Sequence, residues 1–495
     1  MSSKKYDPKE AMSGGLVKRG VITTGLAQAL KLVLQLCSVA ILSRLLSPND
    51  FGLLAMAGPI VAFLAMFQNL GLTQLTVQRP TISHKEINFL FWISTAAGVV
   101  VTLVILLIAP VAAAFYGEPD VGLLVAGLAL PFLITSSGAQ HIALINRRME
   151  FGNLAIIDVA TSAVTLIVVV SWALYAPSFW ALWAGAVAGA VVSISLSWIY
   201  SRWRPSMPRW TEEGWGMIKF GSDLTGFNLA NFFARNLDNV IIGKVSGSVS
   251  LGLYERAYKL LLFPLTQVTN PLSQVMLPTL SRLVSEPGRY RYAFIRVMRL
   301  MLLAILPGVA AAIAMADTLI PFFLGEKWVA AIPIFQALGF AAMVQPLNNP
   351  AGWLFISQGR SRDFLWCGLA TAVIAISAFA LGITWGPVGV AVCYAVSEIL
   401  KTPILWWFVC RKGPIRLYDF FGQIWPFIVG GQLAILIIMN VLPYLPKTPF
   451  LTLALGTFVA YSTVLLFALI TKSGRLTVSE ITKAVSTKLS GSGRA

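Results

Sequence analysis

The sequence predicts an all-α polytopic membrane protein of about 14 transmembrane helices, the number of apolar stretches of the ~20 residues that one crossing needs. Hydrophobic residues make up 57% of the 495 residues and charged residues only 12%, about half of the ~25% that is usual in soluble proteins. Residues 41–57 also match residues 241–257 without a gap, with identical residues at four of the positions, 41/241, 52/252, 53/253 and 57/257. A repeat inside a chain of apolar spans indicates a duplicated membrane bundle, which is typical of transporters.

The apolar stretches form two groups of six spans and a C-terminal pair. The first group covers 17–43, 52–76, 88–114, 122–144, 153–175 and 180–200. The second covers 220–243, 253–277, 294–316, 331–356, 364–384 and 387–409, and the pair covers 422–442 and 451–470. We expect an N-terminal lobe over 1–200, a cytoplasmic linker over 201–219, a C-terminal lobe over 220–410, spans 13 and 14 within 411–471, and a cytoplasmic tail over 472–495.

The repeat predicts how the two lobes are related. In the copies at 41–57 and 241–257, Gly52 matches Gly252 and Ala57 matches Ala257. A second match joins NRRMEF at 146–151, after span four, to GRSRDF at 359–364, after span ten. Both matches give a unit of six spans, so the copies share one orientation and surround a central cavity in parallel repeat.

The net charge of +17 is explained by topology and not by nucleic acid. With a cytoplasmic N-terminus, most of the 37 Lys and Arg residues fall on the cytoplasmic side. The outer side receives only Arg44, Lys244, Arg256, Lys259, Lys327 and Lys447. The positive-inside rule therefore places both termini in the cytoplasm.

The sequence does not favour an enzyme, a metal site or a resident cofactor. The outer loops, for instance 115–121 and 176–179, are too short to hold a soluble catalytic domain. The four cysteines have no paired spacing and the two histidines lie far apart in sequence. We therefore expect no catalytic residues, no metal and no cofactor other than a coupling ion, H⁺ or Na⁺.

Polar side chains on spans one and seven are the main candidates for a substrate site, because ionisable groups inside a bilayer are costly and usually functional. On span seven, one helix face carries Asn228, Asn231, Arg235, Asp238 and Asn239. The repeat aligns Lys31 of span one with Asn231, and Arg44 with Lys244. The alternative is structural: Arg235 and Asp238 can neutralise each other, and asparagines can join helices by hydrogen bonds.

Other polar groups inside spans have two interpretations as well. Asp158 shares its helix face with Thr161, Ser162 and Thr165, which suits an ion or proton site or a buried hydrogen-bonded acid. Glu255 with Lys259, and Glu398 with Lys401, have the spacing of ordinary helical ion pairs. Residues 345–350, QPLNNP, predict a hinge or a polar bend in span ten.

The chain resembles a known family of membrane proteins. Its basic N-terminal segment, RLLSPNDFGLLAMA at 44–57, NRRMEF at 146–151 and NVIIGKVSGSVSLGLYERAYKL at 239–260 resemble the Wzx-type flippases. These are the lipopolysaccharide and exopolysaccharide flippases of the polysaccharide transport family, within the multidrug/oligosaccharidyl-lipid/polysaccharide exporter superfamily. The likeness is greatest to exporters of the colanic acid and succinoglycan kind.

The resemblance implies transport of an undecaprenyl-diphosphate-linked oligosaccharide across a bacterial inner membrane by alternating access. The implied partners are that substrate and membrane lipids, with a polysaccharide polymerase and a chain-length regulator as further candidates. Cations suit a diphosphate and amides suit sugars, so we expect Lys31, Arg44, Arg235 and Lys244 to bind the anion and Asn228, Asn231 and Asn239 to contact the substrate. Asp158 and Asp238 are the candidates for ion coupling. A multidrug/cation antiporter of the same superfamily and a membrane-embedded glycan polymerase or ligase are the alternatives.

Overall fold

The computed structural model describes residues 14–69, 72–79, 81–208, 214–446 and 448–491. Every regular element in these ranges is helical, so the prediction of an all-α fold is confirmed. Eleven helices within the described part of the chain are long and apolar enough to cross a membrane. One of the eleven, Ser361–Lys412, contains two of the expected spans, and the two spans expected at 220–243 and 253–277 are not among them.

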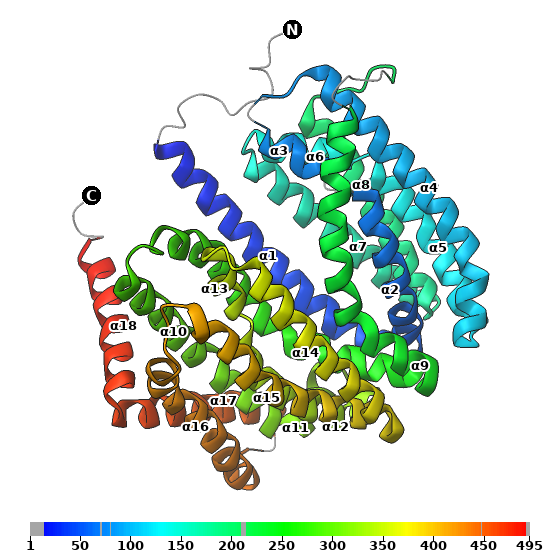
Figure 1. Cartoon of the computed structure of the whole chain (residues 1–495). Helices are drawn as coiled ribbons and strands as arrows, with labels where there is room; N and C mark the ends of the chain where they lie inside the picture. The colour runs from blue at the N-terminus through cyan, green and yellow to red at the C-terminus, as the bar shows by residue number, and fades with distance from the viewer. Residues whose placement is uncertain (1–13, 70–71, 80, 209–213, 447, 492–495) are drawn as a thin grey trace. The chain divides into compact units, whose positions relative to one another are not determined.

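The chain divides into two compact units, Met1–Gly252 and Leu253–Ala495. The lobe and linker limits expected from the sequence, which place the second lobe at 220–410, stay a prediction. Figure 1 shows the helices of both units in chain order.

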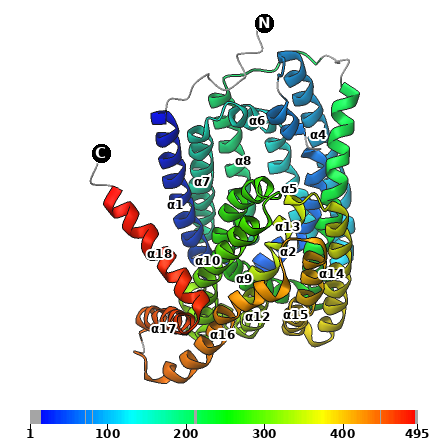
Figure 2. The ribbon, with the colours of Figure 1, turned by 60° about the vertical axis from the view of Figure 1, so that its left-hand side comes forward.

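The first unit is built from helices that pack side by side. Its helices are α1 (Gly14–Leu45), α2 (Pro48–Asn69), α3 (Leu72–Gln78), α4 (His84–Tyr116), α5 (Pro119–Ser136), α6 (Ala139–Arg147), α7 (Phe151–Tyr175), α8 (Phe179–Ser201) and the first part of α9 (Gly214–Arg282). Helices α4 and α5 pack side by side, as do α7 and α8, and α1 lies along α7 (Figure 2).

Local sequence explains the hairpin between α4 and α5. A capping box begins α4: the Ser83 side chain accepts from the Glu86 backbone N–H, and the Glu86 side chain accepts from the Ser83 N–H. Gly117 ends α4 in the left-handed region (φ 75°), where glycine avoids a side-chain clash. Pro119 then begins α5, a position at which its missing N–H costs nothing. The two apolar spans therefore face each other across a tight turn.

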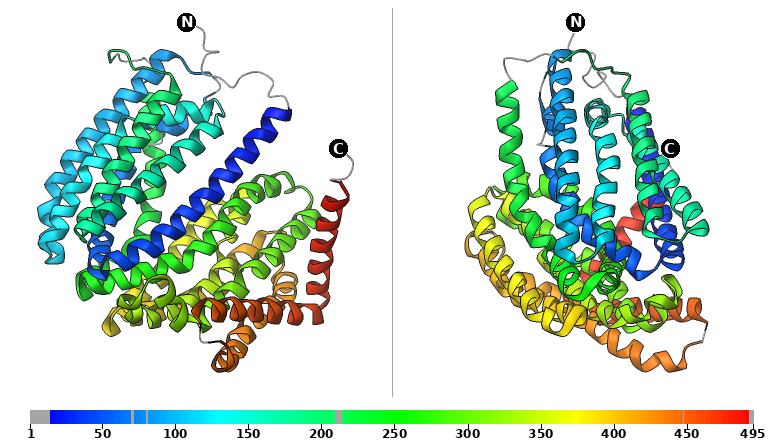
Figure 3. Two further views of the ribbon diagram at one scale, coloured as in Figure 1. Left: turned by 180° about the vertical axis from the view of Figure 1, so that it is seen from behind. Right: turned by 90° about the vertical axis from the view of Figure 1, so that its right-hand side faces the viewer.

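The second unit holds the rest of α9 and the following helices. These are α10 (Pro287–Ala314), α11 (Ala316–Phe323), α12 (Ile332–Asn348), α13 (Ala351–Ser357), α14 (Ser361–Gly382), α15 (Gly386–Lys412), α16 (Leu417–Val441), α17 (Pro449–Ile470) and α18 (Lys472–Gly491). Helix α10 contributes a large share of the core, packing against α12, α16 and α17. Helix α18 leaves the end of α17 at a sharp angle (Figure 3).

The segment expected to form a hinge or polar bend in span ten lies at the boundary between two assigned helices. Helix α12 ends at Asn348 and α13 begins at Ala351. The amides beside the boundary bond to α15: Gln345 Nε2 donates to Tyr394 Oη at 3.1 Å, and Asn348 Nδ2 donates to Thr402 Oγ1 at 3.1 Å. These bonds satisfy polar groups that lipid could not.

The two copies of the repeat pack against each other at glycines. In the first unit, a Cβ on Gly52 would lie 1.7 Å from the carbonyl oxygen of Ser248, and a Cβ on Gly252 would lie 1.9 Å from that of Pro48. Pro48 and Ser248 hold the same place in the two copies, as Gly52 and Gly252 do. The contact is therefore reciprocal. Close by, Gly247 breaks the helical path of α9 with φ 80° and ψ 177°, a conformation that is essentially confined to glycine.

Candidate functional site

Two residues that the sequence assigned to different roles form an ion pair. Lys31 Nζ of α1 lies 2.9 Å from Asp158 Oδ2 of α7. The Lys31 side chain is 31% exposed and that of Asp158 is 52% exposed. Both helices are candidate membrane spans, so this charge pair lies on apolar helices. The structure thus pairs Lys31, which was expected to bind the anion, with Asp158, which was expected to couple transport to an ion.

The hydroxyls that follow Asp158 along its helix face have different partners. Ser162 Oγ donates to the backbone oxygen of Asp158 at 2.8 Å, so this hydroxyl serves the helix. Thr165 faces α8, where a Cβ on Gly189 would lie 2.4 Å from its Oγ1. Thr161 Oγ1 is buried and has no hydrogen-bond partner among the described residues. Thr161 also packs toward α8, where a Cβ on Gly189 would lie 3.5 Å from its Cγ2, and its position three residues after Asp158 puts it on the same side of α7.

The exposure of the pair makes it accessible. Both side chains are partly exposed, so a ligand can reach the two charged groups. A ligand that carries two phosphate charges can therefore compete with Asp158 for the Lys31 ammonium.

Two further cations expected in the site, Arg44 and Lys244, have described side chains. Arg44 is exposed in the last turn of α1. Lys244 of α9 donates to the backbone oxygen of Phe115, and its Nζ lies 5.3 Å from the centre of the Phe115 ring. The bond to the end of α4 gives Lys244 a structural contact besides its proposed role.

The polar face expected on span seven falls only partly within the described side chains. Asp238 is 8% exposed, and its Oδ1 accepts from the backbone N–H of Asn239 at 2.9 Å. The side chains of Asn228, Asn231 and Arg235 lie outside the described residues, although their backbone belongs to α9. Their roles, and the alignment of Lys31 with Asn231, stay predictions.

Both ion pairs expected from helical spacing are confirmed. Lys259 pairs with Glu255, and Lys401 Nζ lies 2.7 Å from Glu398 Oε1. The side chains of the second pair are only 12% and 10% exposed, so this charge is neutralised locally inside the helix bundle.

Sequence reasoning missed a charged cluster that joins α10 to α18. Arg299 is 2% exposed, and its guanidinium lies 3.2 Å from Gln423 Oε1 and 3.5 Å from Glu480 Oε1. Arg296 and Tyr292 of α10 contact the same carboxylate, at 3.0 and 2.9 Å. From the sequence these arginines were only cytoplasmic charges, because a pairing across 181 positions leaves no periodic signal.

The two histidines, distant in sequence, meet at Trp203 in the first unit. Trp203 Nε1 donates to His84 Nδ1 at 3.0 Å, and the His141 ring lies 5.2 Å from the Trp203 ring. His141 Nδ1 lies 2.7 Å from Ser201 Oγ. Burial, and secondarily the charge of Arg204, lowers the pKa of His141 to about 4. The cluster holds the start of the expected linker against α4.

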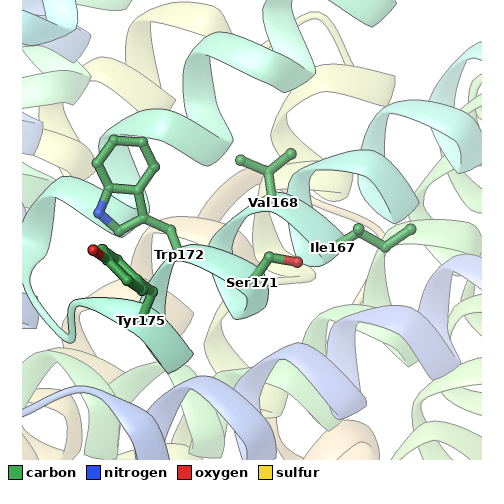
Figure 4. Close-up of a pocket in the computed structure, with 5 residues that line it drawn as sticks. All are labelled: Ile167, Val168, Ser171, Trp172 and Tyr175. Carbon is green, nitrogen blue, oxygen red and sulfur yellow. The ribbon is translucent and has the colours of Figure 1, made fainter.

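An apolar surface cavity of about 470 Å³ lies along the last turns of α7. Figure 4 shows Trp172 and Tyr175 together at this end of the helix, with Ser171 and Ile167 further along it. Tyr175 is 92% exposed and Trp172 is 43% exposed. Amphipathic rings at the end of an apolar span are typical of the membrane–water interface.

Comparison with known proteins gives a family match and several relatives. The family model described as "Polysaccharide biosynthesis protein" matches residues 41–333. The chain is 24% identical to the lipopolysaccharide biosynthesis protein WzxC of Escherichia coli K12, over 79% of this chain and 80% of that protein. It is 23% identical to the teichuronic acid biosynthesis protein TuaB of Bacillus subtilis 168, over 82% and 84%. It is 25% identical to the succinoglycan biosynthesis transport protein ExoT of Rhizobium meliloti 1021, over 70% and 71%.

Solved structures show the same fold. The lipid II flippase MurJ, in a structure described as inward closed, matches with a TM-score of 0.72 at 12% identity, over 91% of this chain and 98% of MurJ. A multidrug transporter of the MATE family in an inward-facing conformation matches with a TM-score of 0.59, also at 12% identity, over 77% and 94%. The chain therefore has the fold of a multi-pass membrane transporter.

Proposed function

The chain belongs to the family of polysaccharide biosynthesis proteins, and we propose that it is a flippase for lipid-linked oligosaccharide repeat units. In this proposal the substrate is an undecaprenyl-diphosphate-linked oligosaccharide. It moves from the cytoplasmic to the periplasmic leaflet of a bacterial inner membrane, for exopolysaccharide or lipopolysaccharide synthesis. The names of WzxC, TuaB and ExoT, together with the fold shared with MurJ, support this function.

The observation that carries the proposal is the Lys31–Asp158 ion pair. A diphosphate needs a cation inside the membrane-spanning part of the protein, and an unpaired cation there would be costly when no substrate is bound. Asp158 neutralises Lys31 while no substrate is bound. When the diphosphate binds Lys31 through a charge-assisted hydrogen bond, the carboxylate is released.

The released carboxylate gives the transport cycle a coupling step. An unpaired Asp158 inside a span is unfavourable, and a bound proton or sodium ion removes that cost. Sodium would take the carboxylate and the unpartnered hydroxyl of Thr161 as oxygen ligands. Substrate and ion would then occupy the site together, and alternating access would carry them between the two faces.

A cation antiporter is the second candidate, because the MATE transporter shares the fold. An antiporter for cationic drugs needs a net acidic site, whereas the site here offers Lys31 with one carboxylate. The two functions differ in the ligand that displaces the pair: an anion frees Asp158, and a cation frees Lys31.

Export in cells that lack their own flippase tests the proposal. The chain should restore polymer synthesis, and Lys31→Gln should lower export about tenfold or more, the size of one lost charge-assisted hydrogen bond. Lys31→Arg should retain most of the export. The matched control is Lys472→Gln, which removes an exposed lysine at the start of α18.

Two results would overturn this function. Normal export by Lys31→Gln, with wild-type amounts of protein in the membrane, would remove Lys31 from the site. Resistance to cationic dyes without any polymer export would establish the antiporter instead. Arg235→Gln should also abolish export while the protein still inserts, and this variant tests the proposed role of span seven independently of Lys31.

A further inference from the structure

A cavity with charged lining residues lies in the second unit. It has a volume of about 560 Å³ and is lined by three connections: the one between α9 and α10, the one between α13 and α14, and the one between α15 and α16. Its polar lining residues are Tyr290, Gln358, Arg360 and Lys412. Helices α10 and α14 begin here and α15 ends here, so the cavity lies where candidate membrane spans reach the surface.

The inner wall of the cavity is fixed by hydrogen bonds. Gln358 Nε2 donates to Tyr290 Oη at 2.9 Å, and Tyr290 Oη lies 2.7 Å from Ser357 Oγ. Arg360 Nη1 donates to Gln358 Oε1 at 3.3 Å and to the backbone oxygen of Val409 at 2.9 Å. These hydrogen bonds hold the Gln358, Tyr290 and Arg360 side chains in place, so Arg360 contributes a positive charge at a fixed position in the wall.

Lys412 supplies the mobile charge. Its side chain is 62% exposed, and its Nζ lies 3.9 Å from Asp363 Oδ1. Two arginines are closer to that carboxylate: Arg360 at 3.0 Å and Arg411 at 3.2 Å. Three cations thus share one Asp363, and Lys412 is the one that it holds least. An anion in the cavity can recruit the Lys412 ammonium without breaking a close pair.

The surface beside the cavity is apolar. Trp366 of α14 and Trp407 of α15 are each 55% exposed, and Leu369 is 48% exposed. The Arg411 guanidinium lies 4.8 Å from the centre of the Trp407 ring, so charge and apolar surface adjoin. A free phosphate would use only the cavity, whereas a phospholipid would use both the cavity and the exposed side chains of α14 and α15.

We propose that this cavity binds the phosphate headgroup of an anionic phospholipid, with the acyl chains along α14 and α15. Lys412 moves onto the phosphate, Arg360 contributes a fixed charge, and the Gln358 amide and Tyr290 hydroxyl border the headgroup. Basic pockets at the ends of transmembrane helices recognise anionic lipids by this combination of charge and depth.

Lipid binding to the full-length chain in detergent tests the proposal, with native mass spectrometry as the readout. Dioleoyl phosphatidylglycerol should bind more tightly than dioleoyl phosphatidylcholine. Lys412→Gln should raise the apparent Kd for phosphatidylglycerol about fivefold, the effect of one lysine at an anionic surface. Gln358→Glu should raise it further, because it keeps the acceptor for Arg360 and places a negative charge in the cavity. Lys472→Gln, which removes an exposed lysine elsewhere in the same unit, should leave the Kd unchanged.

Three results would overturn the proposal that this cavity binds a phospholipid headgroup. An equal loss of binding in Lys472→Gln would mean that the lipid responds to net charge and not to this cavity. Inorganic phosphate that binds the wild type as tightly as phosphatidylglycerol, with the same loss in Lys412→Gln, would assign the cavity to a soluble anion. Unchanged binding in Gln358→Glu would also overturn the proposal, since an added carboxylate must repel a headgroup phosphate at this site. Polymer export is not part of the readout, so failure here leaves the flippase assignment intact.

Discussion

Lys31 and Asp158 stand 127 positions apart in sequence, yet their charged atoms lie 2.9 Å apart between α1 and α7. Both side chains are partly exposed, so a ligand can reach the pair and take the place of one partner. This combination of proximity and access suits a transport cycle, because Asp158 neutralises Lys31 until the substrate binds.

The Thr161 hydroxyl distinguishes the two coupling ions. Thr161→Val removes the unpartnered oxygen and keeps the side-chain shape. If sodium is the coupling ion, the sodium concentration for half-maximal export should rise about tenfold, the effect of one lost ligand-type interaction. If the ion is a proton, carried by Asp158 alone, export should keep its pH dependence in this variant.

Asp158→Asn serves as the companion variant. It should abolish ion dependence in either case, because it removes the carboxylate. Export that still follows a sodium or pH gradient in Asp158→Asn would exclude Asp158 as the coupling residue. Ser162→Ala is the matched control, since its hydroxyl bonds the backbone oxygen of Asp158, and its ion dependence should be that of the wild type.

The reciprocal glycine contact predicts an unusual sensitivity to one methyl group. Gly52→Ala would place a Cβ 1.7 Å from the Ser248 carbonyl oxygen, a backbone atom that cannot move aside by a rotamer change. We expect destabilisation at or above the ~3 kcal/mol upper end for overpacked cores. Thermal unfolding in detergent measures it.

Gly58→Ala is the control for this substitution. Gly58 lies in the same helix, α2, and a Cβ there would meet nothing within 4 Å. Its melting temperature should equal or exceed that of the wild type, because alanine favours helix over glycine by about 1 kcal/mol. A wild-type melting temperature for Gly52→Ala would show that the two helices separate more easily than their contact suggests.

The buried His141 side chain should make the folded protein less stable in mild acid. Its pKa is about 4 in the folded protein, against an ordinary value of 6.5, because burial disfavours the imidazolium. The unfolded state therefore binds the extra proton first as the pH falls. Neutral His141 therefore contributes its full share of the free energy of unfolding above pH 6.5. That share, about 3 kcal/mol at 1.36 kcal/mol per pH unit, is lost as the pH falls from 6.5 to about 4.

A comparison with His141→Gln separates the effect of His141 from the protonation of carboxylates, which occurs in both proteins. The melting temperature of the wild type should fall more steeply than that of His141→Gln between pH 6.5 and 4. Parallel curves for the two proteins would mean that another group causes the acid sensitivity. His84 remains in both proteins and so cancels from the difference.

Glu480 is expected to stabilise the second unit through Arg299. Glu480→Gln removes the carboxylate that faces the Arg299 guanidinium, and the Arg299 side chain is only 3% exposed. The expected loss is about 3 kcal/mol, as for a broken buried pair. Glu286→Gln is the control: its pair with Arg289 has side chains that are 73% and 47% exposed, so the loss should stay below about 1 kcal/mol. Equal melting temperatures for the two variants would contradict this assignment.

Local patterns in the sequence predicted most of the helical framework. Apolar runs located the spans, and the i,i+4 and i,i+3 spacings located the Glu255–Lys259 and Glu398–Lys401 pairs, because both signals depend on near neighbours along the chain. The helix boundary after Asn348 lies within QPLNNP, which is a local pattern of the same kind.

Contacts between distant elements could not be predicted in this way. The sequence offered Lys31 and Asp158 as separate candidates, since their pairing depends on α1 lying along α7. Glu480 gave no sign of its role at Arg299 for the same reason. Residues 220–277 were expected to form two separate spans, and the structure has two helical stretches here that meet at a kink at Gly247 within α9.

The glycine contact between the repeat copies has a historical consequence. When Gly52 meets the residue equivalent to Pro48, and Gly252 meets Pro48 itself, the contact has the reciprocity of an isologous interface between identical subunits. One patch on a half-length ancestor would have sufficed to make such a contact with its own copy. In the present chain a side chain at either glycine would clash with the backbone of the other copy, so each copy limits what the other can hold at this position.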